Sequence, residues 1–141
     1  MSLMTAIEVG ASGLTAQRRR LEVLMGNLAN ANTIKPPGTE PFRRKDVLFS
    51  SANPETSFGT ALDDAVQGVE ISGVVTDRGE PRKQHDPGHP YADKNGDVLY
   101  PNINPLEEMV NVLSATRSYE ANLQAVNMAK EMQQKTLEIL R

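Results

Sequence analysis

NPLEEMVNVLSATRSYEANLQAVNMAKEMQQKTLEILR, residues 104–141, is the stretch that decides the fold of this 141-residue chain. Asn104 is a favourable N-cap, and Pro105 suits the first position of a helix. No proline and no glycine follow Pro105. The stretch therefore predicts one helix over residues 105–141, about 55 Å long at about 1.5 Å per residue.

The apolar side chains of this predicted helix fall on one narrow stripe. They recur at intervals that fit about 3.5 to 3.6 residues per turn, which is typical of a helix that packs on another helix. The residues predicted to make helix packing or assembly contacts are Met109, Leu113, Tyr119, Leu123, Val126, Leu137 and Leu140. Because only one side is apolar, the helix needs a partner to cover that side.

Residues 1–34 predict the partner helix. A leucine or isoleucine recurs every seven residues, and Leu24 lies beside this seam. The seam residues are Ile7, Leu14, Leu21 and Leu28. We expect the seam to pack on the C-terminal helix within one subunit, and the remaining faces to pack on neighbouring subunits. The expected partners on the C-terminal helix are Leu113, Leu123, Val126, Leu137 and Leu140.

Three glycines interrupt the N-terminal helix pattern, at Gly10, Gly13 and Gly26. Each costs about 1 kcal/mol relative to alanine in a helix interior. Two interpretations remain open. The helix is simply weak or kinked at these positions, or a neighbouring helix approaches closely there.

Several polar residues are candidates for contacts that set the register between helices. Asparagine is unfavourable inside helices because its amide competes for backbone groups, whereas a buried asparagine can fix the register of a coiled coil. The candidates are Asn27, Asn30, Asn32, Thr33 and Asn122. The alternative is that they are exposed in frayed turns.

The centre of the chain, residues 35–104, is irregular with weak strand signals. All nine prolines lie between positions 36 and 105. Strands are predicted within residues 42–49, over 69–75 where apolar residues alternate, and over 97–100 after the Asn95-Gly96 turn pair. Residues 50–68 predict a flexible loop. The predicted fold is mainly α with a small β-rich centre, and the terminal regions 1–34 and 105–141 form one coiled-coil-like pair.

Composition excludes several classes of function. The chain has no cysteine, which removes disulfides, thiol catalysis and thiolate zinc sites. A net charge of −3 argues against nucleic acid as a partner. No apolar run reaches the roughly 18 residues of a membrane span, and the N-terminus lacks the pattern of a cleavable secretory signal.

The sequence offers little catalytic chemistry. His85 and His89 flank a proline-glycine turn and could ligate a metal, but an exposed polar turn is the preferred interpretation. Residues 93–97 resemble the start of a calcium loop, which fails because Val98 stands where glycine is required and Asn104 stands where glutamate is required. No nucleotide-binding or hydrolase motif is present. We therefore expect no enzyme and no cofactor.

Three stretches together resemble a known family. The first is LTAQR at 14–18 leading to NLANANT at 27–33, and the second is DPGHPYAD at 86–93 followed by NG at 95–96 and PNIN at 101–104. The third is EEMV at 107–110 with RSYEAN at 117–122. The chain resembles the axial proteins of the bacterial flagellar rod and hook, and the second stretch with the short length indicates the proximal-rod class.

This resemblance implies a structural subunit with no catalytic site. Its terminal helices would pack with those of neighbours into a tube, with the centre outside, and transmit motor torque to hook and filament. Its partners would be other copies, other proximal and distal rod proteins, the rod-to-base adaptor and the export apparatus. It would be exported through the flagellar type III apparatus without a cleaved signal and reside in the rod, in the periplasmic space. The alternative is a cytoplasmic helical-hairpin adaptor or chaperone.

Overall fold

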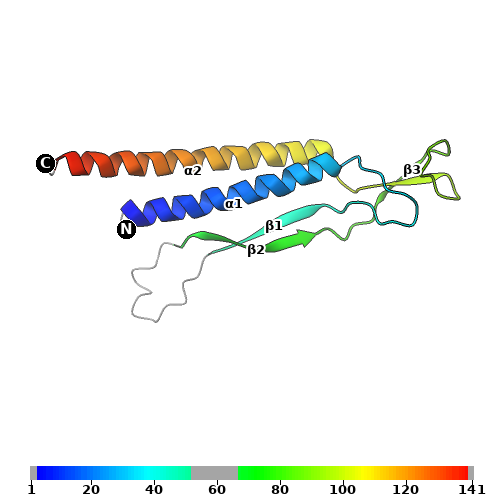
Figure 1. The fold of residues 1–141 in the computed structure, drawn as a ribbon, viewed down its shortest axis with the longest axis horizontal. Helices are drawn as coiled ribbons and strands as arrows, with labels where there is room; N and C mark the ends of the chain where they lie inside the picture. The colour runs from blue at the N-terminus through cyan, green and yellow to red at the C-terminus, as the bar shows by residue number, and fades with distance from the viewer. Residues whose placement is uncertain (1–2, 52–66, 140–141) are drawn as a thin grey trace, which may run out of the picture.

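The computed structural model describes residues 3–51 and 67–139 of the chain. Two long helices lie side by side, α1 (Leu3–Asn30) and α2 (Pro105–Ile139), and run in opposite directions (Figure 1). Between them in sequence come two antiparallel pairs of short strands. The prediction of a mainly helical chain with a small β-rich centre is confirmed. Most of the predicted loop 50–68, and Leu140, lie outside the described residues.

The start of α2 follows the predicted local signals. The side-chain oxygen of Asn104 accepts a hydrogen bond from the Leu106 amide at 3.1 Å, and the Asn104 carbonyl accepts one from the Glu108 amide. Asn104 is therefore the N-cap and Pro105 the first helical residue. At the other junction α1 ends at Asn30, ahead of the Pro36-Pro37 pair that cannot continue a helix.

Strands β1 (Lys45–Ser51) and β2 (Val69–Thr76) form a ribbon that lies along α1, on the side away from α2 (Figure 1). Val47 is buried beneath α1, and the amide of Val69 donates to the Ser12 hydroxyl at 3.0 Å. The alternation predicted for 69–75 is only partly correct. The register shifts between Leu48 and Phe49, so Ser72 is an extra residue that interrupts the alternation.

Strands β3 (Arg82–His85) and β4 (Asp97–Tyr100) form a second hairpin at the end of the molecule far from both termini (Figure 1). The sequence predicted β4 but missed β3, because all four residues of β3 are polar and exposed. Asn95-Gly96 does not join the two strands directly. It closes a longer loop, in which Gly96 has a φ of 79° and its carbonyl accepts from the Asp86 amide.

Within the described part of the chain, the buried apolar residues form no large central core. Small side chains dominate between the helices, and a second group lies where the helices meet the strands. The buried apolar residues are Ala16, Leu24, Ala31, Val47, Val98, Ile103, Ala115, Val126 and Ala129. Large apolar side chains consequently remain on the outside of the molecule.

Candidate assembly surfaces

Near the end of the helix pair that carries both chain termini, α1 and α2 approach each other closely at two glycines of α1. A Cβ added to Gly10 would lie 2.5 Å from Cγ2 of Val126, and one added to Gly13 would lie 2.9 Å from Nδ2 of Asn122. Nothing lies within 4 Å of a Cβ added to Gly26. The two helices of one chain therefore approach closely at Gly10 and Gly13, whereas no other part of the described chain lies close to Gly26.

A polar cluster, which we call the clasp, joins the other end of the helix pair to the ribbon. It consists of Asn27, Arg44, Lys45 and Glu108. The Asn27 amide donates to the Lys45 carbonyl at 2.7 Å and to Glu108 Oε2 at 3.1 Å, and its oxygen accepts from the Lys45 amide at 2.9 Å. Asn27 is 0% exposed, so this asparagine satisfies its hydrogen bonds entirely inside the protein.

Arg44 completes the clasp by forming an ion pair with the carboxylate of Glu108. Its Nε donates to Glu108 Oε1 at 2.6 Å, and Glu108 is only 1% exposed. The hydrogen bond to the carboxylate raises the pKa of the Arg44 guanidinium above its usual value, and burial opposes this more weakly. The sequence analysis missed both residues. The sequence did carry one indication for Glu108. It precedes Ala115 by seven residues and Asn122 by fourteen, and this spacing places all three on the side of α2 that faces α1.

The other predicted register residues separate into two groups. Asn122 is half-buried against Gly13, between the helices. Asn30 instead donates to the Gly26 carbonyl of its own helix at 2.8 Å and accepts a long bond from the Thr33 hydroxyl. Asn32 and Thr33 are exposed. Asn30, Asn32 and Thr33 therefore make no contact between the two helices of one chain, since they lie where α1 ends.

On α1 the predicted seam residues are buried or half-buried, whereas on α2 most of the predicted residues are exposed. Leu24 is buried, and the four other seam residues, Ile7, Leu14, Leu21 and Leu28, are half-buried. On α2, Val126 is buried and Tyr119 half-buried. The expected pairing within one chain is wrong for Leu113, Leu123 and Leu137, which are exposed. The inner side of α2 carries smaller residues instead, including Ala115, Asn122 and Ala129, which match the close approach at the glycines.

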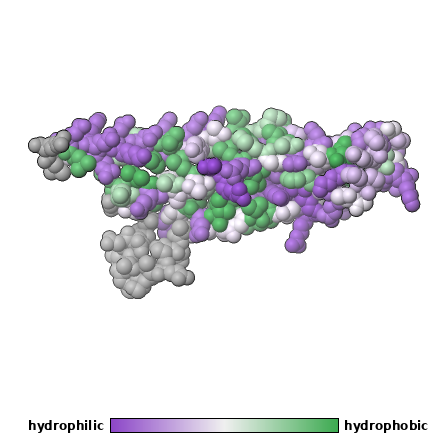
Figure 2. Space-filling view, viewed as in Figure 1, coloured by the Kyte–Doolittle hydropathy of each residue, from purple (hydrophilic) through white to green (hydrophobic). Residues whose placement is uncertain are grey.

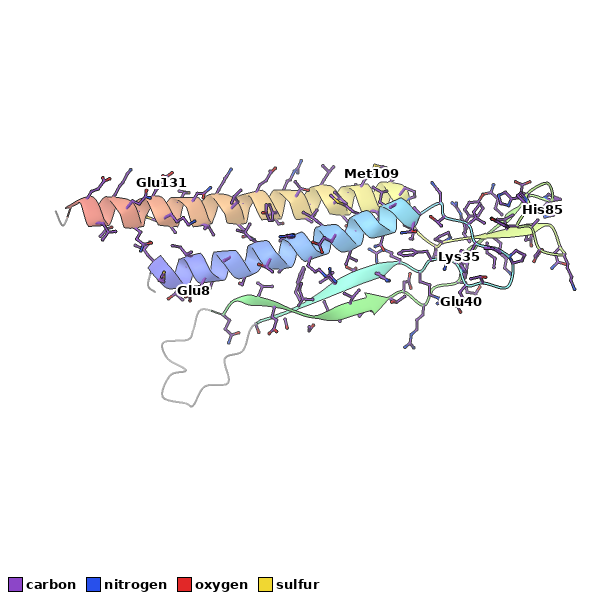
Figure 3. The ribbon with its side chains drawn as sticks, in the orientation of Figure 1. Glu8, Lys35, Glu40, His85, Met109 and Glu131 are labelled. Carbon is purple, nitrogen blue, oxygen red and sulfur yellow. The ribbon has the colours of Figure 1, made fainter. Side chains whose placement is uncertain are left out.

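Large apolar residues cover the first two turns of α2 on the side away from α1. We call this surface the outer ridge: it consists of Leu106, Met109, Val110 and Leu113. These side chains are 46% to 69% exposed, and a shallow groove runs beside them along Ser114, Arg117 and Ser118. Figure 2 shows the apolar surface over this end of α2, and Figure 3 shows Met109 pointing away from α1. Contiguous exposed apolar patches are typical of surfaces that bind another protein.

The β3–β4 hairpin holds the two histidines apart by giving each its own partner. His85 Nδ1 lies 3.0 Å from Asp97 Oδ1, and His89 Nδ1 accepts from the Tyr91 amide at 3.1 Å. In residues 3–51 and 67–139, no three histidine or carboxylate side chains are grouped so that they could hold a metal ion. The carboxylate of Asp93 accepts from the amides of Asp97 and Asn95, and these bonds lower the pKa of Asp93.

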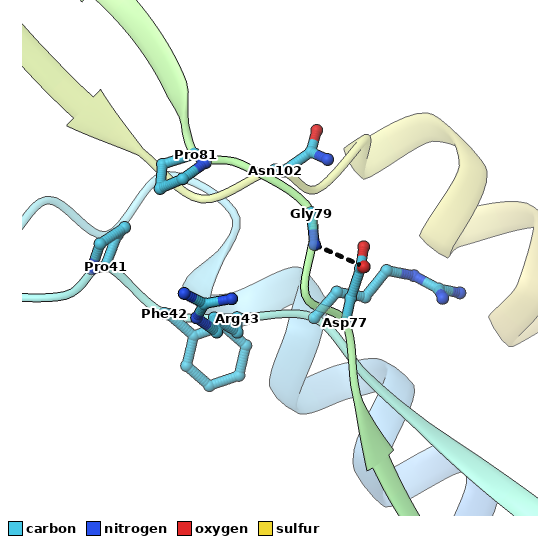
Figure 4. Close-up of a pocket in the computed structure, with 8 residues that line it drawn as sticks. Pro41, Phe42, Arg43, Asp77, Gly79, Pro81 and Asn102 are labelled. Atoms are coloured by element: carbon cyan, nitrogen blue, oxygen red, sulfur yellow. Dashed lines mark hydrogen bonds between the residues drawn. The ribbon is translucent and has the colours of Figure 1, made fainter.

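A crevice lies where the connections between ribbon, hairpin and α2 cross (Figure 4). Its rim is held by the Gly79 amide, which donates to Asp77 Oδ1 at 2.8 Å. The crevice is lined by Pro41, Phe42, Arg43, Arg44, Asp77, Gly79, Pro81 and Asn102. Its volume of about 10 Å³ leaves room for about one water molecule, so it cannot hold an organic substrate.

In the part of the chain that the structure describes, neither helix contains a stretch that is long and apolar enough to cross a membrane.

Comparisons with known proteins agree with this arrangement of terminal helices around a small centre. A family described as "Flagella basal body rod protein" matches residues 7–34, and one described as "Flagellar basal body rod FlgEFG protein C-terminal" matches residues 95–139. The chain is 38% identical over 137 residues to the flagellar basal-body rod protein FlgC of Salmonella typhimurium, covering 97% of each chain. It is 38% identical to FlgC of Borreliella burgdorferi and 39% identical to FlgC of Bacillus subtilis, in each case covering 99% of both chains. The chain therefore belongs to the FlgC family of flagellar basal-body rod proteins.

Proposed function

We propose that this chain is a structural subunit of the proximal rod of the bacterial flagellar basal body. It assembles helically through its terminal helices and transmits motor torque to the hook and filament. The observation that carries this proposal is the outer ridge: in a chain of the FlgC family, four large apolar side chains at the start of α2 face away from its own partner helix. Covering them requires neighbouring subunits.

The internal contacts of the subunit suit a part that bears load. The clasp ties α1, β1 and α2 at one end, and the glycine contacts hold the helices together near the other. Both leave the outer surfaces free for neighbours. We assign no catalytic role, because the relatives are rod proteins by name. Its partners would be other copies, other proximal and distal rod proteins, the rod-to-base adaptor and the export apparatus.

The subunit would be exported through the flagellar type III apparatus without a cleaved signal and would reside in the rod, in the periplasmic space. The candidate register residues keep a role in this proposal. Asn27 and Asn122 would fix the two helices of one subunit, while Asn30, Asn32 and Thr33 would be available to neighbours at the end of α1.

Electron cryotomography of motors in a strain that lacks this chain tests the proposal, with a strain carrying the restored chain as control. We expect the rod to be missing while the membrane-embedded base remains. A normal rod and hook in swimming cells would contradict the proposal and favour a cytoplasmic adaptor or chaperone.

A further inference from the structure

The β1–β2 ribbon carries a second exposed apolar surface, which we call the ribbon patch: Leu48, Gly73 and Val75. Leu48 and Gly73 are cross-strand partners, and Val75 is paired with Asp46. Val47 is buried beneath α1, and because side chains alternate along a strand, Leu48 and Asp46 lie on the opposite face. Leu48 is 50% and Val75 49% exposed.

Gly73 gives the ribbon patch a bare centre. Nothing lies within 4 Å of a Cβ added at this position, and the φ of Gly73 is not positive, so larger residues fit there in the free subunit. Gly73 directly follows Ser72, the extra residue of the strand, and strand glycines are common both at such irregularities and where another group approaches the backbone. The patch is therefore a shallow apolar seat flanked by Leu48 and Val75.

The outer ridge and the ribbon patch lie on opposite sides of the subunit. The layers are stacked in the order α2, α1, ribbon (Figure 1), and among the described residues the strands of the ribbon contact α1 but not α2. Figure 2 shows apolar surface at both edges, over the start of α2 and along the ribbon. Neither surface can cover the other within one subunit.

We propose that the outer ridge of one copy packs on the ribbon patch of the next copy. The inference rests on the proposed function and names the contact through which copies join. A contact between two different surfaces repeats from copy to copy and builds a ring or an open helical array, as a tube wall requires. It also covers both apolar surfaces at once, and the convex ridge meets a seat that has no side chain at its centre.

Charges at the edges of the two surfaces are complementary. Arg117 follows Leu113 by one helical turn, is exposed, and makes no ion pair within residues 3–51 and 67–139. Asp46 borders Val75 on the ribbon, and its half-exposed carboxylate pairs with Arg44 at 3.4 Å and accepts a hydrogen bond from the Val47 amide at 2.9 Å. A guanidinium beside the ridge and a carboxylate beside the patch favour the ridge-to-patch contact over other pairings.

Self-pairing of two outer ridges is the competing arrangement. It would bring two convex surfaces together and would close as a pair. It would also leave the ribbon patch uncovered. The structure therefore favours the contact between unlike surfaces.

Cysteine cross-linking tests the contact directly, because the chain has no native cysteine. Leu113→Cys and Gly73→Cys are introduced together in one chain, and separately in two chains expressed in the same cells. Basal bodies are purified under mild oxidation, so that two cysteines in direct contact at the covered interface join in a disulfide. We expect a ladder of cross-linked oligomers from the double variant, mixed dimers from the two single variants together, and no dimer from Leu113→Cys alone.

The outcomes separate this inference from the proposed function. Dimers from Leu113→Cys alone would overturn the contact in favour of ridge pairing. Absence of the 113–73 product from basal bodies that contain the chain would also overturn it, while the proposed function would stand. Absence of the chain from basal bodies of swimming cells would contradict the proposed function instead.

A second variant keeps the inference testable if the cysteines impair assembly. Gly73→Ile fills the seat, and its side chain has open space in the free subunit, so its thermal unfolding should match that of the parent chain. We expect this variant to lose swimming. Thr76→Ile, which adds apolar bulk to the same strand outside the patch, is the matched control and should swim. Normal swimming of the Gly73→Ile strain would overturn the proposed contact.

Discussion

The two faces of α2 have opposite compositions, and neither follows the usual rule for a protein that folds alone. The face against α1 carries Ala115, Asn122 and Ala129, while the outer ridge exposes Leu106 and Leu113. Small residues inside let the backbones approach closely, as Gly10 and Gly13 require. Because burying one leucine side chain contributes about 1.5–3 kcal/mol, most of that stabilisation is left for contacts with neighbours. The comparison teaches that large apolar side chains at the start of α2 contribute little to the fold of the single chain and, under the proposed function, would be covered on assembly.

Placing a charge in the outer ridge of α2 should have the largest effect on swimming. Leu113→Asp places a carboxylate in the outer ridge and should abolish swimming, because the charge would be buried without a partner on assembly. In the free chain the same site is exposed, so the free energy of unfolding should change by no more than about 0.5 kcal/mol. Swimming in soft agar and urea unfolding followed by circular dichroism measure the two effects. Leu123→Asp should also abolish swimming, with a larger loss of stability in the free chain because Leu123 is only 41% exposed.

A charge reversal away from the helices serves as the control. Lys94→Asp lies in the exposed loop between β3 and β4 and should leave swimming intact. If Leu113→Asp cells swim normally, or if the free Leu113→Asp chain is strongly destabilised, the division between an inner face for folding and an outer face for assembly fails.

Breaking the ion pair of the clasp should lower the free energy of unfolding, and it tests the face of α2 that packs within the chain. Arg44→Met leaves the carboxylate of Glu108 buried with only the Asn27 amide as a partner, which should cost about 3–5 kcal/mol of unfolding free energy. Arg43→Met removes only an exposed pair with Glu40 and should cost less than about 1 kcal/mol. Urea unfolding of the two variants gives the difference.

A second substitution distinguishes lost charge balance from lost packing. Adding Glu108→Met to the Arg44→Met chain removes the orphaned carboxylate and should restore much of the stability. Equal stability of the Arg44→Met and Arg43→Met chains would show that the clasp does not hold the helices to the ribbon.

The glycines of α1 provide a smaller test of the inner face. Gly26→Ala has open space and should stabilise the free chain by about 0.5–1 kcal/mol through helix propensity. Gly10→Ala gains the same propensity but meets the methyl group of Val126, and such overpacking costs about 1–3 kcal/mol. The net effect should be destabilising. Stabilisation of equal size in both variants would contradict the close approach of the helices.

The smallest expected effect lies in the β3–β4 hairpin, which belongs to neither face of α2. Hydrogen bonds from the amides of Asp97 and Asn95 lower the pKa of Asp93 in the folded chain. The unfolded chain therefore binds the Asp93 proton more tightly than the folded chain does. The contribution of Asp93 to the free energy of unfolding is consequently complete above its ordinary pKa and is lost as the pH falls through the lowered pKa. Below about pH 4 the amide NMR signals of Asn95 and Asp97 should begin to shift. In an Asp93→Asn chain this titration should disappear, and its persistence there would contradict the assignment.

Local signals allowed much of the fold to be predicted from the sequence. The N-cap at Asn104, the proline pair after α1 and the seven-residue repeat of α1 each act within a few residues, so both helices were predicted. Strand β3 was missed because its exposed polar residues carry no apolar pattern. The meaning of Gly10 and Gly26 stayed open because it depends on which residue of α2 lies opposite each glycine.

The site was harder to predict than the fold, for two physical reasons. Arg44 and Glu108 are 64 positions apart, and no local pattern indicates that they form an ion pair. The seam of α2 was assigned to its largest apolar residues, on the assumption that burial within the chain decides where they lie. For Leu113 and Leu137 that assumption fails, because these residues are exposed in the single subunit.

The central claim is that the outer ridge is exposed in the free subunit and covered in the rod. Thiol labelling tests it most directly, with a Leu113→Cys chain labelled by a maleimide once as purified subunit and once in isolated basal bodies. A Lys94→Cys chain, changed in the exposed loop between β3 and β4, reports general access. The account predicts fast labelling of Leu113→Cys in the free subunit and strong protection in basal bodies, with Lys94→Cys reacting in both. Equal labelling of Leu113→Cys in the two states would contradict the claim.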